Sequence, residues 1–170
     1  KLNCTALRFS NLYGPLSLRK TSVVSKMIKS IKDKQEIVIY GNGNQTRDFI
    51  FVEDVANANV TLLESNLDSQ ESFNVGTGSP TKVIDLATSL CKELNSKVTP
   101  QISEEFRYGD SRHFIHDSTK LGNYNWKVNY SIDEGIKKYT DWFKTQENVQ
   151  TTFPEASEGL RKIGVIQSSD

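Results

Sequence analysis

The chain has 170 residues and a mass of 19.2 kDa, and its 21 basic and 21 acidic residues give a formal net charge of zero. This length predicts one domain, with or without a tail, that buries about 70% of its unfolded surface without needing a disulfide or a metal. There is no basic excess for nucleic acid or an anionic membrane, and the apolar runs are too short to cross a bilayer. No apolar signal segment follows the first residues, so we expect a cytoplasmic protein. The neutral charge and the short apolar runs predict that it has no nucleic-acid or membrane partner.

Predicted strands and helices alternate through the first part of the chain. Residues 2–9 predict a strand, and residues 10–15 contain turn formers that predict a loop. The next apolar residues recur with helical spacing and predict one buried face: Val23, Val24, Met27, Ile28 and Ile31. Residues 36–40 are rich in β-branched side chains and predict a short strand.

A turn-rich loop at residues 41–45 leads to the apolar segment 49–52. A helix is expected directly afterwards, because Glu53 and Asp54 place negative charge at the positive end of a helix dipole. Residues 72–75 predict another short strand, which a loop containing glycine and proline follows.

Later apolar residues again share one predicted helix face: Ile84, Ala87, Leu90, Cys91 and Leu94. Residues 99–102 predict a strand, and residues 104–117 predict a charged loop or edge segment. Ser131 and Glu134 have the spacing of a capping box, which predicts the start of another helix.

Residues 147–170 show no clear period and predict a tail, or a lone helix around residues 155–162. Short strands that alternate with helices predict an α/β domain whose sheet is mixed rather than purely parallel.

Two glycine pairs suggest a dinucleotide turn but do not complete it. Gly41-x-Gly43 and Gly76-x-Gly78 both lack the last glycine of Gly-x-Gly-x-x-Gly, so both predict ordinary turns. The Gly-x-Ser-x-Gly motif of a nucleophilic hydrolase is absent as well.

The histidines and cysteines give weak signals. His113 and His116 have a spacing that could ligate a metal, but no third or fourth ligand is evident, so a solvated pair is expected. Cys4 and Cys91 are expected to be buried thiols rather than a disulfide.

Three arginines lie close in sequence to aromatic residues or to loops. Arg47, Arg107 and Arg112 stand near loop–strand junctions, with Tyr40 and Tyr108 beside them. A guanidinium binds phosphate oxygens with two parallel hydrogen bonds, and an aromatic ring stacks on a base. Alternatively each arginine pairs with a neighbouring carboxylate, and spacing alone favours that alternative.

Five ordered segments resemble motifs of the extended short-chain dehydrogenases/reductases, the NAD-dependent nucleotide-sugar epimerases and dehydratases. They are residues 7–15 (Leu-Arg-Phe-Ser-Asn-Leu-Tyr-Gly-Pro), residues 39–55 (similar to Tyr-Gly-Asp-Gly-x-Gln-x-Arg-Asp-Phe-x-x-Val-x-Asp), residues 73–78 (Phe-Asn-Val-Gly-Thr-Gly), residues 107–112 (Arg-Tyr-Gly-Asp-Ser-Arg), and Trp126 with the helix at residues 131–143. Two positions depart from the family pattern, because Asn125 replaces a glycine and Tyr108 replaces a proline.

The resemblance implies a two-lobed fold in which an N-terminal Rossmann lobe binds NAD and a smaller lobe binds the nucleotide sugar. Residues 1–15 would be the last strand region of a partial Rossmann-type NAD(P)-binding fold. Residues 16–146 would be the small, mixed α/β substrate-binding lobe, and residues 147–170 a tail.

The family's catalytic Tyr-x-x-x-Lys pair is not in this sequence, since none of the six tyrosines has a lysine four residues later. The family uses that tyrosine to move a proton while NAD takes hydride from the sugar C4. We therefore expect no redox chemistry from this chain alone: it is a fragment, or its NAD-binding half is a separate chain, or catalysis was lost. The expected protein partner is that missing half, or a second copy.

The resemblance also implies individual site residues. Ser10 would lie near the nicotinamide of NAD. The residues implied at the diphosphate are Asn11, Thr21, Ser22, Val23, Arg47 and Arg107, with Arg112 as an additional contact. Tyr40 would lie against the pyrimidine ring, and Asp110 would bind the ribose of the nucleotide.

Three interpretations follow. The first is the UDP- or dTDP-hexose-binding half of an NAD-dependent sugar-nucleotide 4-epimerase, with the same half of a dTDP-glucose 4,6-dehydratase-like enzyme as the alternative. The second is a non-catalytic module that binds nucleotide sugars. The third is an interaction protein that kept the fold and lost the ligand.

Overall fold

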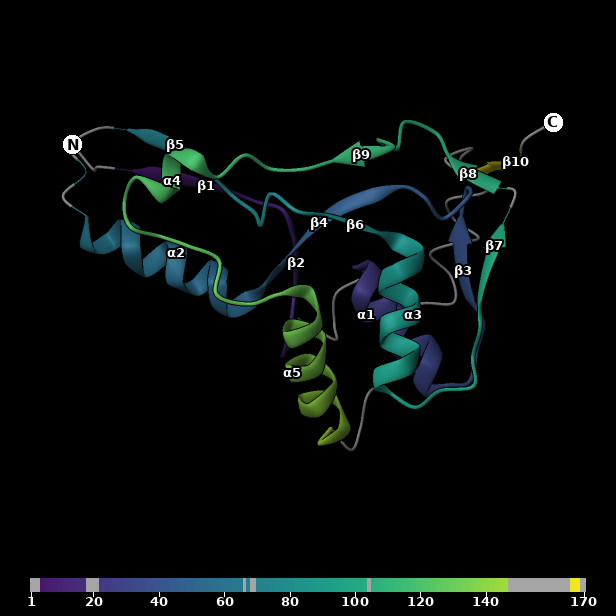
Figure 1. The fold of residues 1–170 in the computed structure, drawn as a ribbon. Coiled ribbons are helices and arrows are strands. Elements are labelled where there is room, and N and C mark those ends of the chain that lie inside the picture. Colours follow the sequence, from purple (N-terminus) through teal and green to yellow (C-terminus); the bar gives the residue numbers. More distant parts are fainter. Residues whose placement is uncertain are drawn as a thin grey trace.

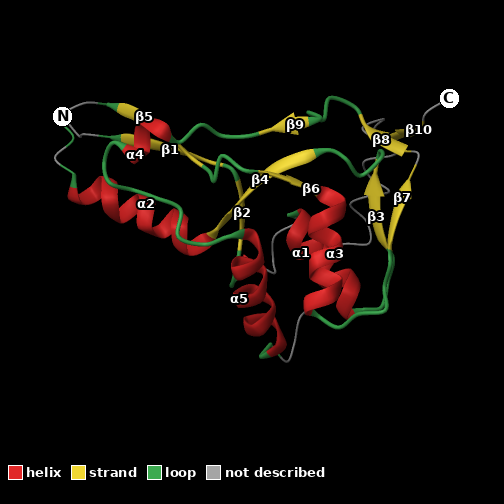
Figure 2. Cartoon of the chain, in the orientation of Figure 1, coloured by secondary structure: helices red, strands yellow, loops and turns green. Residues whose placement is uncertain are grey.

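The computed structural model describes residues 4–17, 22–65, 67, 70–103, 105–146 and 166–168 (Figure 1). Helices and strands alternate through them (Figure 2), which confirms the predicted mixed α/β class. In chain order the elements are β1 (Thr5–Phe9), β2 (Asn11–Tyr13), α1 (Val23–Lys32), β3 (Ile37–Tyr40), β4 (Thr46–Phe51), α2 (Val52–Glu64), β5 (Glu71–Val75), β6 (Pro80–Lys82), α3 (Val83–Glu93), β7 (Pro100–Ser103), β8 (Glu105–Arg107), β9 (His113–Phe114), α4 (Thr119–Gly122), α5 (Ile132–Lys144) and β10 (Ile166–Ser168).

One end of the molecule is built on the parallel pair of β1 and β5, with α2 and α4 beside it (Figure 1). The register runs from Thr5 opposite Glu71 to Phe9 opposite Val75. The buried core at this end combines side chains of β4, α2, β5, α4 and the loop after α4: Ile50, Val55, Ala58, Leu62, Phe73, Val75, Leu121 and Trp126. The apolar side chains of α2 therefore pack against residues that are distant in the sequence, such as Leu121 and Trp126.

The other end contains β2, β4 and β6 in one sheet, with β9 also on β4, and the parallel pair of β3 and β7. In Figure 1, helices α1, α3 and α5 lie below β4, β6 and β9, and β3 and β7 stand to the right of α1 and α3. The apolar faces of the three helices meet in one buried core, which includes Met27, Ile28, Leu86, Leu90, Ile136 and Tyr139. The predicted faces of α1 and α3 are both on this core. The capping box of Ser131 and Glu134 at the start of α5 is confirmed.

One buried aspartate, Asp48, fixes two loops by hydrogen bonds. The Asp48 carboxylate accepts hydrogen bonds from Thr77, from the backbone of Gly78 and from the backbone of His116. A Cβ on Gly76 would collide with this carboxylate, which is why a glycine fits there. Since Asp48 follows Arg47 in β4, its bonds fix the strand that carries that arginine.

The structure corrects several sequence predictions. The predicted loop at residues 10–15 contains β2, which pairs in parallel with β4 from Asn11 opposite Phe49 to Tyr13 opposite Phe51. The predicted charged segment contains β8 and β9, and the predicted tail contains β10, which pairs with β8. The alternative helix at residues 155–162 lies outside the described residues.

The two cysteines are free, as expected, and Cys91 is buried in α3. Burial raises the pKa of the Cys91 thiol. The prediction that Cys4 is also buried is wrong, because it is exposed just before β1.

Candidate functional site

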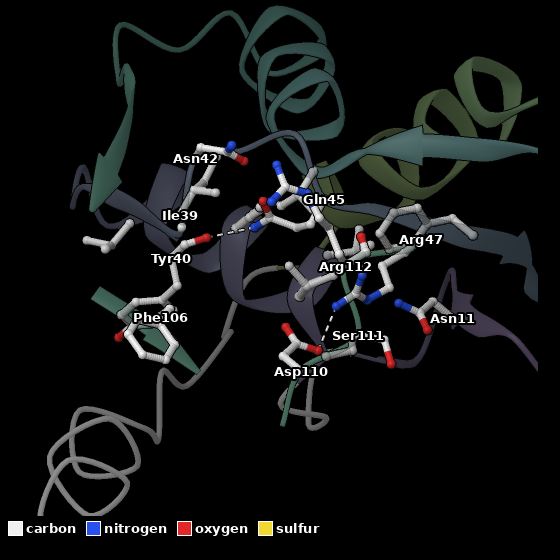
Figure 3. A pocket seen from close by; sticks show the side chains of 18 of the residues that line it. Asn11, Ile39, Tyr40, Asn42, Gln45, Arg47, Phe106, Asp110, Ser111 and Arg112 are labelled. Carbon is white, nitrogen blue, oxygen red and sulfur yellow. Dashed lines mark hydrogen bonds and ion pairs between the residues drawn. The ribbon is translucent and has the colours of Figure 1, made fainter. Parts of the chain in front are cut away.

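An open pocket of about 810 Å³ lies between the start of α1, the end of β3, β4 and the segment that joins β8 to β9 (Figure 3). Pockets for small molecules have volumes of about 300–1,000 Å³. Seven of the residues predicted at a nucleotide sugar line this pocket: Asn11, Ser22, Val23, Tyr40, Arg47, Asp110 and Arg112. The fold thus brings together residues that lie as much as a hundred positions apart.

Arg47 is the most firmly held cation of the pocket, and its side chain is 13% exposed. Its Nη2 donates to Asp110 Oδ1 at 2.6 Å (Figure 3), and its Nη1 donates to the backbone oxygens of Thr46 at 2.8 Å and Arg112 at 3.3 Å. The alternative of an ion pair with a carboxylate is therefore confirmed for Arg47. A guanidinium has five N–H donors, so two N–H groups remain for another acceptor.

The N-terminus of α1 opens on the same pocket. Its N-cap, Ser22, is extended and makes no side-chain capping bond, because its Oγ lies 2.9 Å from Ser25 Oγ. Ser25 in turn belongs to a buried hydroxyl cluster with Ser17 and Tyr139. The first backbone N–H groups of α1 therefore have no side-chain cap from Ser22, at the part of the pocket wall that Ser22 and Val23 line. A helix N-terminus carries partial positive charge and favours an anion.

An aromatic end completes the pocket. Tyr40 and Phe106 lie on one side of it, and Arg47 and Asn11 lie on the other (Figure 3). Gln45 Nε2 donates to the Tyr40 backbone oxygen at 2.7 Å and closes the loop after β3. Guanidinium groups and aromatic rings therefore line the same cavity.

Three predicted site residues are not placed in the pocket. Ser10 is buried at the end of β1, does not line the pocket, and its Oγ has no hydrogen-bond partner. Thr21 and the side chain of Arg107 lie outside what the structure describes. Sequence reasoning missed Phe106 and Gln45, although both stand next to or within motifs that carried the family resemblance.

The two histidines do not behave alike. His113 is exposed, as predicted, and its Nδ1 lies 2.8 Å from Thr46 Oγ1. The prediction of a solvated ring is wrong for His116, which is half-buried, packs edge-on against Phe114, and has an Nδ1 without a partner. Across the described part of the chain, no three potential metal ligands come together.

The described residues do not fit NAD. The glycine turn at Gly41 and Gly43 leads into β4, and the one at Gly76 and Gly78 leads into β6, whereas a dinucleotide turn opens a helix. Both predicted turns are confirmed. The unpartnered Ser10 hydroxyl is one group and makes no dinucleotide site.

Among the described helices, none is long and apolar enough to cross a membrane.

The fold and the sequence both have known relatives. A solved UDP-glucose 4-epimerase from Thermotoga maritima, with UDP-glucose, has a TM-score of 0.75 and 32% identity over 82% of this chain and 45% of its own. A dTDP-L-rhamnose 4-epimerase of Burkholderia thailandensis is 34% identical over 84% of this chain and 40% of its own. The dTDP-glucose 4,6-dehydratase 1 of Escherichia coli is 30% identical over 79% and 39%.

These neighbours place the chain among the Rossmann-type α/β proteins. The family described as "NAD dependent epimerase/dehydratase family" matches residues 1–76, so this part of the chain carries the pattern of a family whose cofactor is NAD. The chain spans 39–45% of the length of the three proteins compared. The family contains both sugar-nucleotide 4-epimerases and 4,6-dehydratases.

Proposed function

We propose that the pocket binds the nucleoside diphosphate part of a UDP- or dTDP-hexose, and that the chain is the nucleotide-sugar half of an NAD-dependent sugar-nucleotide 4-epimerase. The observation that carries this proposal is the pairing of an anion site with an aromatic surface in one cavity. The anion site consists of Arg47, Arg112 and the N-terminus of α1. The aromatic surface consists of Tyr40 and Phe106.

Each part of the ligand finds a chemical counterpart. Phosphate oxygens are acceptors that suit guanidinium groups and helix N–H groups. A pyrimidine ring suits an aromatic face, and ribose hydroxyls can donate to the Asp110 carboxylate, of which one oxygen pairs with Arg47. Asn11 adds an amide that can donate as well as accept. The protein's role at this site is binding and orientation.

Calorimetry with UDP, dTDP and NAD tests the proposal. We expect UDP or dTDP to bind more tightly than NAD, because the pocket groups suit a pyrimidine diphosphate and the glycine turns do not open helices. Tighter binding of NAD would contradict the proposal. Binding of UDP without turnover of UDP-glucose and added NAD would fit both the epimerase half and the non-catalytic module, because this chain alone is expected to do no redox chemistry. No binding of either nucleotide would support an interaction protein.

The half of a dTDP-glucose 4,6-dehydratase-like enzyme is the second candidate, favoured by the similarity to the Escherichia coli dehydratase. The two candidates predict the same pocket chemistry. A clear preference for UDP over dTDP in the same titrations would favour the epimerase, because the second candidate takes a dTDP sugar, whereas a preference for dTDP would fit both candidates.

A further inference from the structure

One wall of the pocket is a single short segment, residues 105–112. Phe106, Asp110, Ser111 and Arg112 all line the cavity from it. Between them, Tyr108 is 74% exposed, and a Cβ on Gly109 would meet no atom within 4 Å. The middle of this wall thus has little packing of its own, and its position depends on how its two ends are held.

The C-terminal end of the wall is held by β4. Arg47 bonds to Asp110 and to the Arg112 backbone oxygen, and the Thr46 backbone N–H donates to that same oxygen at 3.0 Å. These bonds belong to the pocket already described. They leave the opposite end of the segment, where Phe106 stands, to be fixed by other contacts.

The N-terminal end of the wall is β8, and it is held from two sides. The Gly41 backbone N–H donates to the Glu105 backbone oxygen at 2.8 Å. On its other side β8 pairs antiparallel with β10, from Ile166 opposite Arg107 to Ser168 opposite Glu105 (Figure 1). Among the described residues β10 is the strand that pairs with β8, so without it the backbone groups of β8 that face β10 would lose their partners.

We propose that β10 is a positioning strand for the nucleotide pocket, because it fixes β8 and with it the Phe106 side of the ligand site. The inference rests on the proposed function, since it names the segment that preorganises that same pocket. A wall already held in place costs less conformational entropy when a ligand binds. Loss of β10 should therefore weaken binding mainly through faster dissociation.

Two shortened chains test this with UDP as the probe. The chain that ends at Val165 lacks β10, and the matched control that ends at Ser168 keeps it. Ordering one residue of the wall costs about 1–2 kcal/mol, so we expect the Val165 chain to bind UDP about five- to thirtyfold more weakly. The control should match the full chain, and the association rates should differ little.

A ligand-free readout separates this inference from the proposed function. Trypsin can cleave after Arg107 and Arg112, and paired strands resist proteases. We expect faster cleavage there in the Val165 chain than in the Ser168 chain, and protection by UDP in the latter. If the shortened chain does not fold, Gln167→Pro in the full chain disrupts the same pairing, and Gln167→Thr is its control.

Equal UDP affinity and equal cleavage in the two shortened chains would overturn the role of β10 and leave the proposed function standing. If no chain binds UDP, the proposed function fails, and with it the claim that β10 serves a nucleotide site. Faster tryptic cleavage of the Val165 chain than of the Ser168 chain would then show only that pairing with β10 holds β8 in place.

Discussion

Arg47 does two things with one side chain. It holds residues 110–112 against β4, and it lines the cavity while two of its five N–H groups have no acceptor among the described residues. Because Asp110 already compensates its charge, a bound diphosphate would have to share Arg47 with that carboxylate. An arginine suits this sharing because its planar group presents several donors in fixed directions, which a lysine does not.

Arg47→Lys should therefore weaken UDP binding although the charge is kept. One lost charge-assisted hydrogen bond costs about 1.5–3 kcal/mol, which is about ten- to hundredfold in affinity. Isothermal titration of the variant with UDP measures this. Arg8→Lys is the control, because Arg8 bonds to Ser72 on β5 and does not line the pocket. An unchanged dissociation constant for Arg47→Lys would leave Arg47 with its ion pair as its only role.

At the scale of elements, α2 and α5 are tied across the surface by a cluster of three side chains. Glu53 accepts hydrogen bonds from Tyr130 at 2.5 Å and from Lys138 at 2.8 Å, and the Lys138 ammonium lies 4.4 Å from the Tyr130 ring centroid. The hydrogen bonds from Lys138 and Tyr130 hold the pKa of Glu53 below its usual value. The cluster joins the helix that follows β4 to the helix that covers the larger core.

A lowered pKa in the folded state means that the Glu53 carboxylate stabilises the fold at neutral pH. This contribution is present above the usual pKa of a glutamate and is lost as the pH falls through the folded-state value. We expect Glu53→Gln to lower the free energy of unfolding at about pH 7 and to have a smaller effect at about pH 3. Urea titrations at both values check this, with Glu64→Gln as the control on the same helix. A pH-independent difference would contradict the prediction.

For the whole molecule, the described residues leave an apolar edge beside β1. In the described part of the chain, β1 pairs only with β5, and Phe9 at its end is 43% exposed. On α2, Val60 is half-exposed and Leu63 is 84% exposed. An open strand edge with apolar side chains nearby favours pairing with another chain.

We therefore expect the isolated chain to form a dimer or a larger assembly, or to pair with a chain that supplies the NAD-binding lobe. Light scattering over an about tenfold concentration range measures this, because association follows mass action. Leu63→Glu should shift the equilibrium toward monomer, and Leu16→Glu, at an exposed leucine on another segment, is the control. A monomer at every concentration would contradict the prediction.

Much of this architecture could be predicted from the sequence. The helices α1, α3 and α5 follow from apolar spacing, and α5 also from the capping box of Ser131 and Glu134, since both signals are local. Most pocket residues were predicted only through the family resemblance, and for the arginines spacing alone favoured ion pairs. For Arg47 that local interpretation was itself correct.

The tertiary structure decided the rest. Strands β2, β8, β9 and β10 have two or three residues each, too few for an alternating pattern, and they exist because distant partners supply their hydrogen bonds. The same holds for the pocket, where β2, α1, β3, β4 and the 105–112 segment meet only after folding. Local periodicity determines which segments become regular helices, and long-range pairing determines which side chains share a cavity.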